Sequence, residues 1–170
     1  INCPECGTPL TKKEDEAAHY CPNEDHCPPQ IKGKLEHFIS RKAMNIDSLG
    51  EGKIEMLYDN NLVLNVADFY SLNPDVLIGL EKIIPGKEGK KESKISFQEK
   101  TVDNIISGIK ESKQVPFDRV LFGMGIRFVG ATVAKKLTGH FRNITNLKNA
   151  SFEELTEVDE IGVRIAESII

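Results

Sequence analysis

The chain has 170 residues, of which 39% are hydrophobic, 28% are charged and 6% are aromatic, and its formal net charge is −4. This size and composition predict one or two helix-rich domains with a substantial hydrophobic core. No apolar run approaches the roughly 18 residues of a membrane span, and no signal peptide is recognisable, which argues against transmembrane and secretory classes.

The first 29 residues predict a small zinc finger. All the cysteines of the chain lie there, as Cys3, Cys6, Cys21 and Cys27. A C-x2-C knuckle supplies two thiolates from one tight turn, and four thiolates fill the tetrahedral shell of Zn²⁺, which indicates a structural metal. Clustered, reduced thiols also indicate a cytosolic setting. Two alternatives stay open: free or disulfide-bonded thiols, and a site in which His19 or His26 replaces one cysteine.

The rest of the chain predicts short helices and no long strand. Apolar residues recur at helical spacing in Val102, Ile105, Ile106 and Ile109, so we expect a helix over residues 101–112 with Thr101 as its cap. Further short helices are predicted over residues 31–41, 54–58, 76–84 and 120–124. The Lys- and Gly-rich stretch of residues 85–94 predicts a mobile surface loop.

Charge is distributed unevenly along the chain. Residues 119–150 contain six basic residues and no acid, whereas residues 151–170 are acidic. Because screening limits charge effects to about 8–10 Å in physiological salt, a local basic field counts for more than the net charge. Nucleic-acid binding and an ordinary solvated helix face are equally compatible with this pattern.

A repeated unit places an apolar residue before a glycine that opens a helix. Its copies centre on Gly50, Gly130 and Gly162, and a fourth has Gln98 in the glycine position. Glycine permits a positive-φ bend between two helices, and the bend exposes amide N–H groups at the positive end of the second helix. Such amides suit a phosphate, and they bind nucleic-acid backbone without reading sequence. The candidate DNA-binding residues are Gly50, Gly52, Lys53, Lys100, Thr101, Arg127, Gly130, Thr132, Gly162 and Arg164.

This repeated unit resembles the helix-hairpin-helix motif. In addition, the order of motifs over nearly the whole chain resembles the C-terminal half of bacterial NAD-dependent DNA ligase. The residues that carry the resemblance are Cys3-Pro-x-Cys6-Gly7, Cys21-Pro-Asn23, Cys27-Pro-x-Gln30, His37-Phe38-x-Ser40-Arg41-x-Ala43-Met44-x-Ile46, Leu49-Gly50, Ala67-Asp68-x-Tyr70-x-Leu72, Ser112-Lys113, Gly125-Ile126-Arg127-x-Val129-Gly130, Glu153-Glu154-Leu155 and Ala166-Glu167-Ser168-Ile169.

The resemblance implies a mainly α fold, with a four-cysteine zinc finger over residues 1–29 and a domain of four hairpins over residues 30–170. Two departures concern the hairpins. Residues 85–96 look like an insertion into the second hairpin, where Gln98 replaces glycine, and Glu160 stands in the fourth hairpin where the family tends to have a glycine.

The function implied is that of a part of an enzyme, since the family seals nicks between 3′-hydroxyl and 5′-phosphate ends in replication and repair. No Lys-x-Asp-Gly adenylation motif occurs in the chain. We therefore expect a catalytically inactive fragment that binds zinc and nicked duplex DNA. NAD, magnesium, and the adenylation and OB-fold domains belong to the rest of the parent protein, which is expected in the bacterial cytoplasm at the nucleoid.

Two other functions stay open. Paired hairpins recur in DNA-binding modules of other repair and recombination proteins, and an upstream Lys-x-Asp-Gly motif in the full-length gene would distinguish these from a ligase. A zinc hydrolase would need an open metal held by cysteine, His26 and Glu24 or Asp25. Four cysteine ligands argue against it, because they close the coordination shell.

Overall fold

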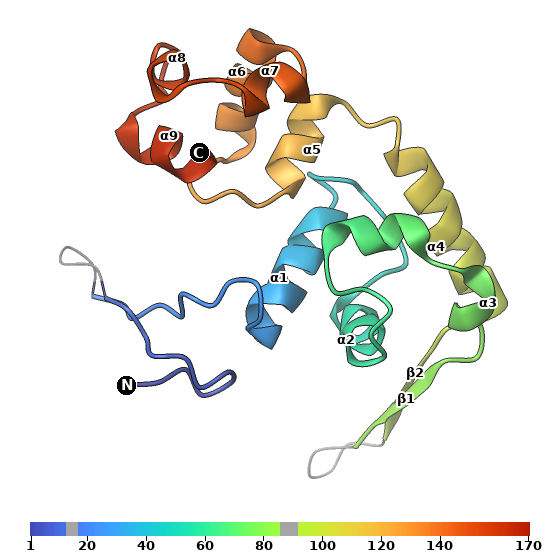
Figure 1. Cartoon of the computed structure of the whole chain (residues 1–170). Coiled ribbons are helices and arrows are strands. Elements are labelled where there is room, and N and C mark those ends of the chain that lie inside the picture. The colour runs from blue at the N-terminus through green and yellow to red at the C-terminus, as the bar shows by residue number, and fades with distance from the viewer. Residues whose placement is uncertain (13–16, 86–91) are drawn as a thin grey trace.

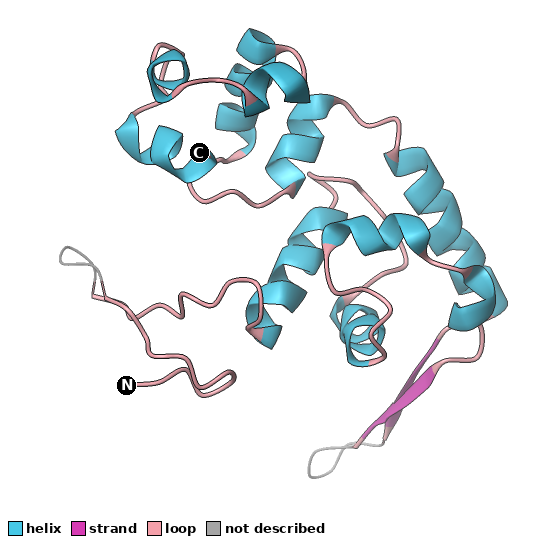
Figure 2. Ribbon diagram, viewed as in Figure 1, coloured by secondary structure: helices cyan, strands magenta, loops and turns pink. Residues whose placement is uncertain are grey.

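The computed structural model describes residues 1–12, 17–85 and 92–170. A ribbon of turns at the N-terminus leads into a body of short helices, which confirms the predicted mainly α fold (Figures 1 and 2). In the ribbon, isolated bridges pair Asn2 with Pro9 and Thr11 with Tyr20. No helix among these residues combines the length and apolar character needed to cross a bilayer.

The first group of helices surrounds one hydrophobic core. The group comprises α1 (Pro28–Ile39), α2 (Glu51–Asp59), the 3-10 helix η1 (Val66–Ser71), α3 (Pro74–Leu77) and α4 (Glu99–Ser112). Two prolines start α1, where a missing N–H costs no hydrogen bond. The side chains buried at the centre of this core include Leu35, Phe38, Ile54, Leu57, Phe69, Leu77, Phe97, Val102, Ile105 and Ile109.

The predicted helix over residues 76–84 is wrong after Leu77, since only its first two residues are helical. Helix α3 ends at Leu77, Gly79 follows with a φ of +88°, and residues 81–84 form strand β1 (Glu81–Ile84). Strand β1 pairs antiparallel with β2 (Ser93–Ser96) in a register that joins Glu81 to Ser96. The β-branched pair Ile83-Ile84 suits a strand, and the partner that stabilises it lies beyond any local helical pattern.

This β-hairpin lies between α3 and α4, where the sequence predicted an insertion (Figure 1). Its base is fixed to α2 by ion pairs from Lys82 Nζ to Glu55 Oε2 at 2.9 Å and to Asp59 Oδ2 at 3.4 Å. The hydrogen bond from Lys82 holds the pKa of Glu55 below its usual range. The predicted mobile loop falls mostly on residues 86–91, which lie outside the described residues.

The predicted helix over residues 101–112 is confirmed, but its predicted cap is wrong. Helix α4 begins at Glu99 and its cap residue is Gln98, whose carbonyl accepts the amide of Val102 at 2.9 Å. Thr101 lies inside the first turn. The repeated unit thus locates the start of this helix more accurately than the capping preference of threonine does.

The second group of helices surrounds a separate core. It comprises α5 (Phe117–Gly123), α6 (Ala131–Phe141), α7 (Ile144–Lys148), α8 (Phe152–Thr156) and α9 (Val163–Ile169). The buried side chains of this core include Leu121, Val129, Ala134, Leu137, Phe141, Leu147, Leu155, Val158, Ile161 and Ala166. Among the described residues from 28 onward, the buried side chains thus form two cores. Helix α1 packs with α2 and α3 with α4 at the first core, and α5 packs with α6 and α8 with α9 at the second.

Helix α5 joins the two groups by docking on α1 and on the turn that follows it. Arg119 donates from Nε to the carbonyl of Ala43 at 2.8 Å and from Nη2 to the carbonyl of Arg41 at 2.7 Å. His37 Nε2 lies 2.7 Å from the carbonyl oxygen of Phe122, on the same helix. A Cβ atom at Gly123 would come within 3.2 Å of the Ala43 methyl, so glycine there favours the close approach of the two groups.

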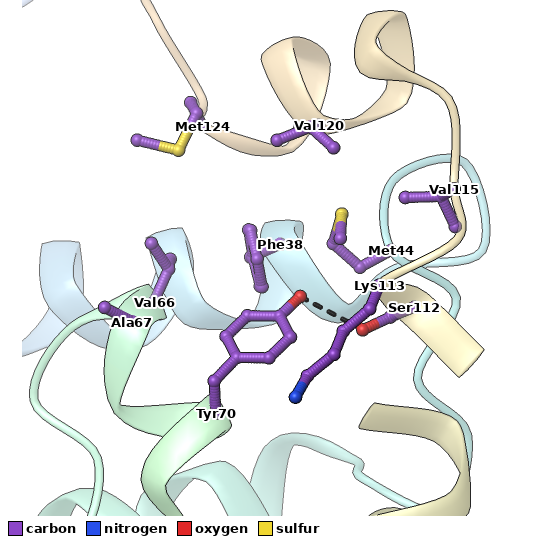
Figure 3. Close-up of a pocket in the computed structure, with 10 residues that line it drawn as sticks. All are labelled: Phe38, Met44, Val66, Ala67, Tyr70, Ser112, Lys113, Val115, Val120 and Met124. Carbon is purple, nitrogen blue, oxygen red and sulfur yellow. Dashed lines mark hydrogen bonds between the residues drawn. The ribbon is translucent and has the colours of Figure 1, made fainter. Parts of the chain in front are cut away.

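Beside this junction an open apolar groove of roughly 420 Å³ separates the two groups. Figure 3 shows Val120 and Met124 on one wall, facing Phe38 and Tyr70 on the other. The hydroxyl of Tyr70 lies 3.0 Å from that of Ser112. The described residues that line the groove include no carboxylate, histidine or cysteine.

We predict that Arg119→Ala lowers the free energy of unfolding by about 2 kcal/mol, because it leaves two carbonyl acceptors without their charged donor. Urea denaturation followed by circular dichroism measures the change. Lys148→Ala, which removes an exposed cation from α7, is the matched control and should be neutral. Equal stability of the two variants would contradict a stabilising role for the Arg119 contacts.

Candidate metal centre and nucleic-acid interface

The four cysteines converge at one point, although they are up to 24 residues apart in sequence. Their Sγ atoms all lie within 4.8 Å of one another. Cys3 and Cys27 are 3.9 Å apart, and Cys6 and Cys21 are 3.4 Å apart. Four sulfurs about 2.3 Å from a tetrahedral Zn²⁺ lie ~3.8 Å from one another, so the cluster has the size of a zinc site. A disulfide is excluded for these pairs, since its S–S bond is about 2.05 Å long.

Backbone hydrogen bonds shape both halves of the cluster. The amide of Gly7 donates to the carbonyl of Cys3 at 2.9 Å, and Gly7 has a φ of +73°, which lets the first knuckle turn sharply. Cys27 is the residue before α1, and its amide donates to Asn23 at 3.0 Å. The side chain of Gln30, on α1, donates to the carbonyl of Cys21 at 3.0 Å. The first core thereby holds the second half of the cluster.

The thiols differ in how readily they lose a proton. Hydrogen bonding with the Thr8 side chain and backbone lowers the pKa of Cys6 to about 6. Burial raises the pKa of Cys21 to about 12 and raises that of Cys27 as well. Four thiolates cannot coexist this closely without a compensating positive charge, which a divalent metal supplies.

Histidine takes no part in the four-thiol group within the described part of the chain. The ring of His26 lies 2.8 Å from the carbonyl of its neighbour Asp25, through Nδ1. The alternative of a Cys3His site and that of an open hydrolytic zinc with His26 as ligand therefore find no support in the geometry. The group of four cysteines would complete a closed, structural coordination shell.

The second feature of interest is the set of bends at the repeated units. Gly50, Gln98, Gly130 and Gly162 are the residues immediately before α2, α4, α6 and α9. All four are exposed, and the apolar residue before each is buried: Leu49, Phe97, Val129 and Ile161. Each unit thus anchors its bend to a core through one side chain and presents the start of a helix to solvent.

The amides at these helix starts have no side-chain cap. Six described helices lack one: the four that follow the repeated units, together with α1 and α5. By contrast, η1, α3, α7 and α8 are capped by Asn65, Asn73, Asn143 and Ser151. Because the first amides of a helix have no intrahelical acceptor, uncapped starts leave N–H donors for solvent or for an anion.

The predicted positive φ at the repeat glycines is wrong. Gly50, Gly130 and Gly162 have φ values of −108°, −76° and −83°. The left-handed residues lie two positions earlier, at Ser48, Phe128 and Glu160, with φ values of 65–66°. A non-glycine residue in this conformation costs about 1–2 kcal/mol. A Cβ at each of these cap positions would meet nothing within 4 Å, so packing in the free protein does not require glycine there.

The predicted side chains occupy two kinds of position. Lys53, Lys100, Thr101, Thr132 and Arg164 all lie in the first turns of α2, α4, α6 and α9, beside the uncapped amides. Arg127 instead lies in the bend before α6. A Cβ at Gly52 would meet Cδ1 at the tip of the Ile95 side chain, so Gly52 lies against the β-hairpin.

The hairpins differ in the charge at the start of their second helices. Glu51 and Glu99 place a carboxylate in the first turns of α2 and α4, whereas the first turns of α6 and α9 contain no acid. The basic run of residues 119–150 contains no acid in sequence, but acids from elsewhere in the chain lie beside it in the fold. Lys136 pairs with Asp159 at 2.8 Å and with Glu160 at 2.9 Å, and its hydrogen bond lowers the pKa of Asp159. These contacts tie the fourth hairpin to α6 and neutralise one cation of the basic run.

Both the four-cysteine segment and the second group of helices match known protein families. Residues 2–28 match the NAD-dependent DNA ligase C4 zinc finger domain, and residues 119–170 match a helix-hairpin-helix motif. The chain is 52% identical over 169 residues to a DNA ligase from Bacteroides fragilis and 53% identical over 168 residues to one from Parabacteroides distasonis. A DNA ligase from Cytophaga hutchinsonii is 53% identical over 169 residues.

The predicted resemblance to the zinc-finger and helix-hairpin-helix region of NAD-dependent DNA ligase is confirmed. Each of the three relatives aligns with 99% of the chain, while the chain spans 23% of each relative. The similarity therefore covers the zinc finger, both cores and the β-hairpin, and it concerns one region of these ligases.

We predict that the purified chain binds one zinc ion and that Cys21→Ser strongly lowers its zinc affinity, because a hydroxyl replaces a soft thiolate. Helicity should be retained, since residues 28–170 have their own two cores. Elemental analysis and far-UV circular dichroism measure both quantities. The control is Thr11→Ala, an exposed change in the same finger. Unchanged zinc content in Cys21→Ser would contradict a four-cysteine site.

Proposed function

We propose that this chain is the part of an NAD-dependent DNA ligase that holds duplex DNA around a nick. Four cysteines, Cys3, Cys6, Cys21 and Cys27, bind a structural zinc, and the hairpins contact the sugar–phosphate backbone without reading base sequence. The observation that carries the proposal is the set of exposed, uncapped helix starts at the repeated units, in a chain about 50% identical to DNA ligases.

The physical basis is that amide N–H groups at a helix start carry partial positive charge and point outward. Phosphate oxygens are suitable acceptors, and contacts with phosphates position a protein on DNA without base specificity. The cations and hydroxyls of Lys53, Lys100, Thr101, Thr132 and Arg164 then add charge or hydrogen bonds beside each bend. Two cores with two hairpins each, joined at α5, suit a grip on both strands of a duplex.

The parent enzyme would supply the chemistry. In this proposal, the chain is inactive alone, because adenylate transfer from NAD takes place elsewhere in the parent enzyme. The magnesium ions and the adenylation and OB-fold domains also lie outside this chain. The zinc finger over residues 1–29 and the hairpin domain over residues 30–170 would be separate domains. A role on chromosomal DNA places the parent protein in the cytoplasm, at the nucleoid.

A DNA-binding module of another repair protein is the alternative. It shares the hairpin physics, but a zinc finger of the NAD-dependent ligase type favours the ligase. A gel-shift comparison of nicked, intact and single-stranded DNA tests the main proposal. We expect the chain to bind nicked and intact duplex and to bind single strands more weakly. Absence of duplex binding at low salt would overturn it.

We predict that Gly130→Leu weakens duplex binding on the order of tenfold, which is about 1.4 kcal/mol. The leucine has room in the free protein, because nothing lies within 4 Å of the new Cβ, but it would cover the amides of α6. Gly139→Leu is the matched control, since Gly139 lies on the same helix and its Cβ position is equally open. Similar affinities of the two variants would contradict phosphate contact at this bend.

We predict that duplex affinity falls steeply with added salt. Displacement of bound cations from only two phosphates gives a loss of about tenfold between ~50 and ~200 mM salt. Fluorescence anisotropy at several salt concentrations measures the slope. A flat titration would show that cationic contacts with phosphates do not contribute to binding.

A further inference from the structure

One arginine lies over two aromatic rings that come from different parts of the molecule. The guanidinium carbon of Arg127 lies 5.2 Å from the ring centre of Tyr20, in the zinc finger, and 5.0 Å from that of Phe128, in the bend before α6. Tyr20 immediately precedes Cys21 in the finger, and its backbone amide donates to the carbonyl of Thr11 at 2.8 Å. The stack therefore connects the finger with the third hairpin.

The position of Phe128 is unfavourable for a large aromatic residue. Its φ is +66° and its side chain is 45% exposed, while the core beneath is filled by its neighbour Val129. Left-handed backbone disfavours bulky residues, and exposure forfeits the gain from burying a ring. Within the described residues, its ring lies beneath the guanidinium of Arg127.

Stacking has a specific effect on an arginine side chain. The guanidinium lies over both rings and is attracted to their faces, while its N–H donors remain able to bond at the edge of the group. Two rings therefore restrict the rotation of the side chain and fix the direction in which its donors point. A side chain ordered in advance loses less entropy when it binds a ligand.

We propose that Tyr20 and Phe128 orient Arg127 toward a DNA phosphate at the third hairpin. The zinc finger then contributes to DNA binding by positioning an arginine of the hairpin domain. Tyr20 is a positioning residue, and Arg127 is the residue that contacts DNA. The inference rests on the proposed function, because it assumes that the third hairpin binds DNA backbone.

The test compares variants of the full chain in the same duplex-binding assay. Removing a cation–π partner at an exposed site predicts a loss of about two- to fivefold in affinity for Tyr20→Ala. Tyr20→Phe keeps the ring and should keep the affinity. Tyr58→Ala is the matched control, because Tyr58 also lies beneath a cation, with Lys32 Nζ 5.1 Å from its ring centre. Zinc content and thermal midpoint should be unchanged in Tyr20→Ala.

A double-variant cycle separates positioning from direct contact. Arg127→Gln should weaken binding more than Tyr20→Ala does, and adding Tyr20→Ala to Arg127→Gln should have no further effect. If the loss from Tyr20→Ala persists in the Arg127→Gln background, Tyr20 acts independently of Arg127 and the inference is overturned. If wild-type binding is lost on Gly130→Leu but not on Arg127→Gln, the inference fails while the proposed function stands. If the wild-type chain itself binds no duplex, the proposed function fails.

Phe128→Gly provides an independent measurement. Glycine accepts the left-handed conformation, so the thermal midpoint should not fall, whereas DNA affinity should drop by about the same factor as in Tyr20→Ala. Full affinity in Phe128→Gly would overturn the role of the second ring. Loss of affinity without loss of stability would support it, because a merely structural residue would affect both together.

Discussion

The amide groups at a helix start need partners, and this constraint organises most of the molecule. Where a helix only has to be stable, an asparagine or serine side chain supplies the partner, as Asn143 does for α7 and Ser151 for α8. At Gly50, Gly130 and Gly162 no side chain is available, and the bend is held from below by a buried apolar residue. Stability is thus supplied by the core, and the exposed donors remain for a ligand.

The zinc finger solves a different problem. A segment of fewer than 30 residues buries too little apolar surface to fold alone, and a metal bound by four thiolates would provide the missing stabilisation. Its cysteines are not isolated from the rest of the protein. Gln30 of α1 bonds to the carbonyl of Cys21, and Tyr20 stacks on Arg127 in the third hairpin. The finger is therefore connected to both cores, which makes it suitable for positioning the hairpins relative to each other.

Several features of the site could be predicted from sequence because they depend on local spacing. The cysteine pattern predicts a metal cluster, and the repeat locates the starts of α2, α4, α6 and α9, including the one without glycine. The left-handed residues Ser48, Phe128 and Glu160 were missed, although they occupy the same place in three repeats and could have been found by that alignment. The helix predicted across residues 81–84 failed because strand β1 depends on a partner at residues 93–96.

The sequence by itself determined the local elements: the metal-binding knuckle, the helical hairpins and the buried residue that anchors each bend, since all of these follow from residues a few positions apart. Only the tertiary structure decided how these elements meet. Arg119 reaches carbonyls 76 and 78 residues away, and Lys136 neutralises acids 23 and more residues away in the fourth hairpin. Such contacts depend on packing between separate cores, and no spacing rule within one chain segment encodes them.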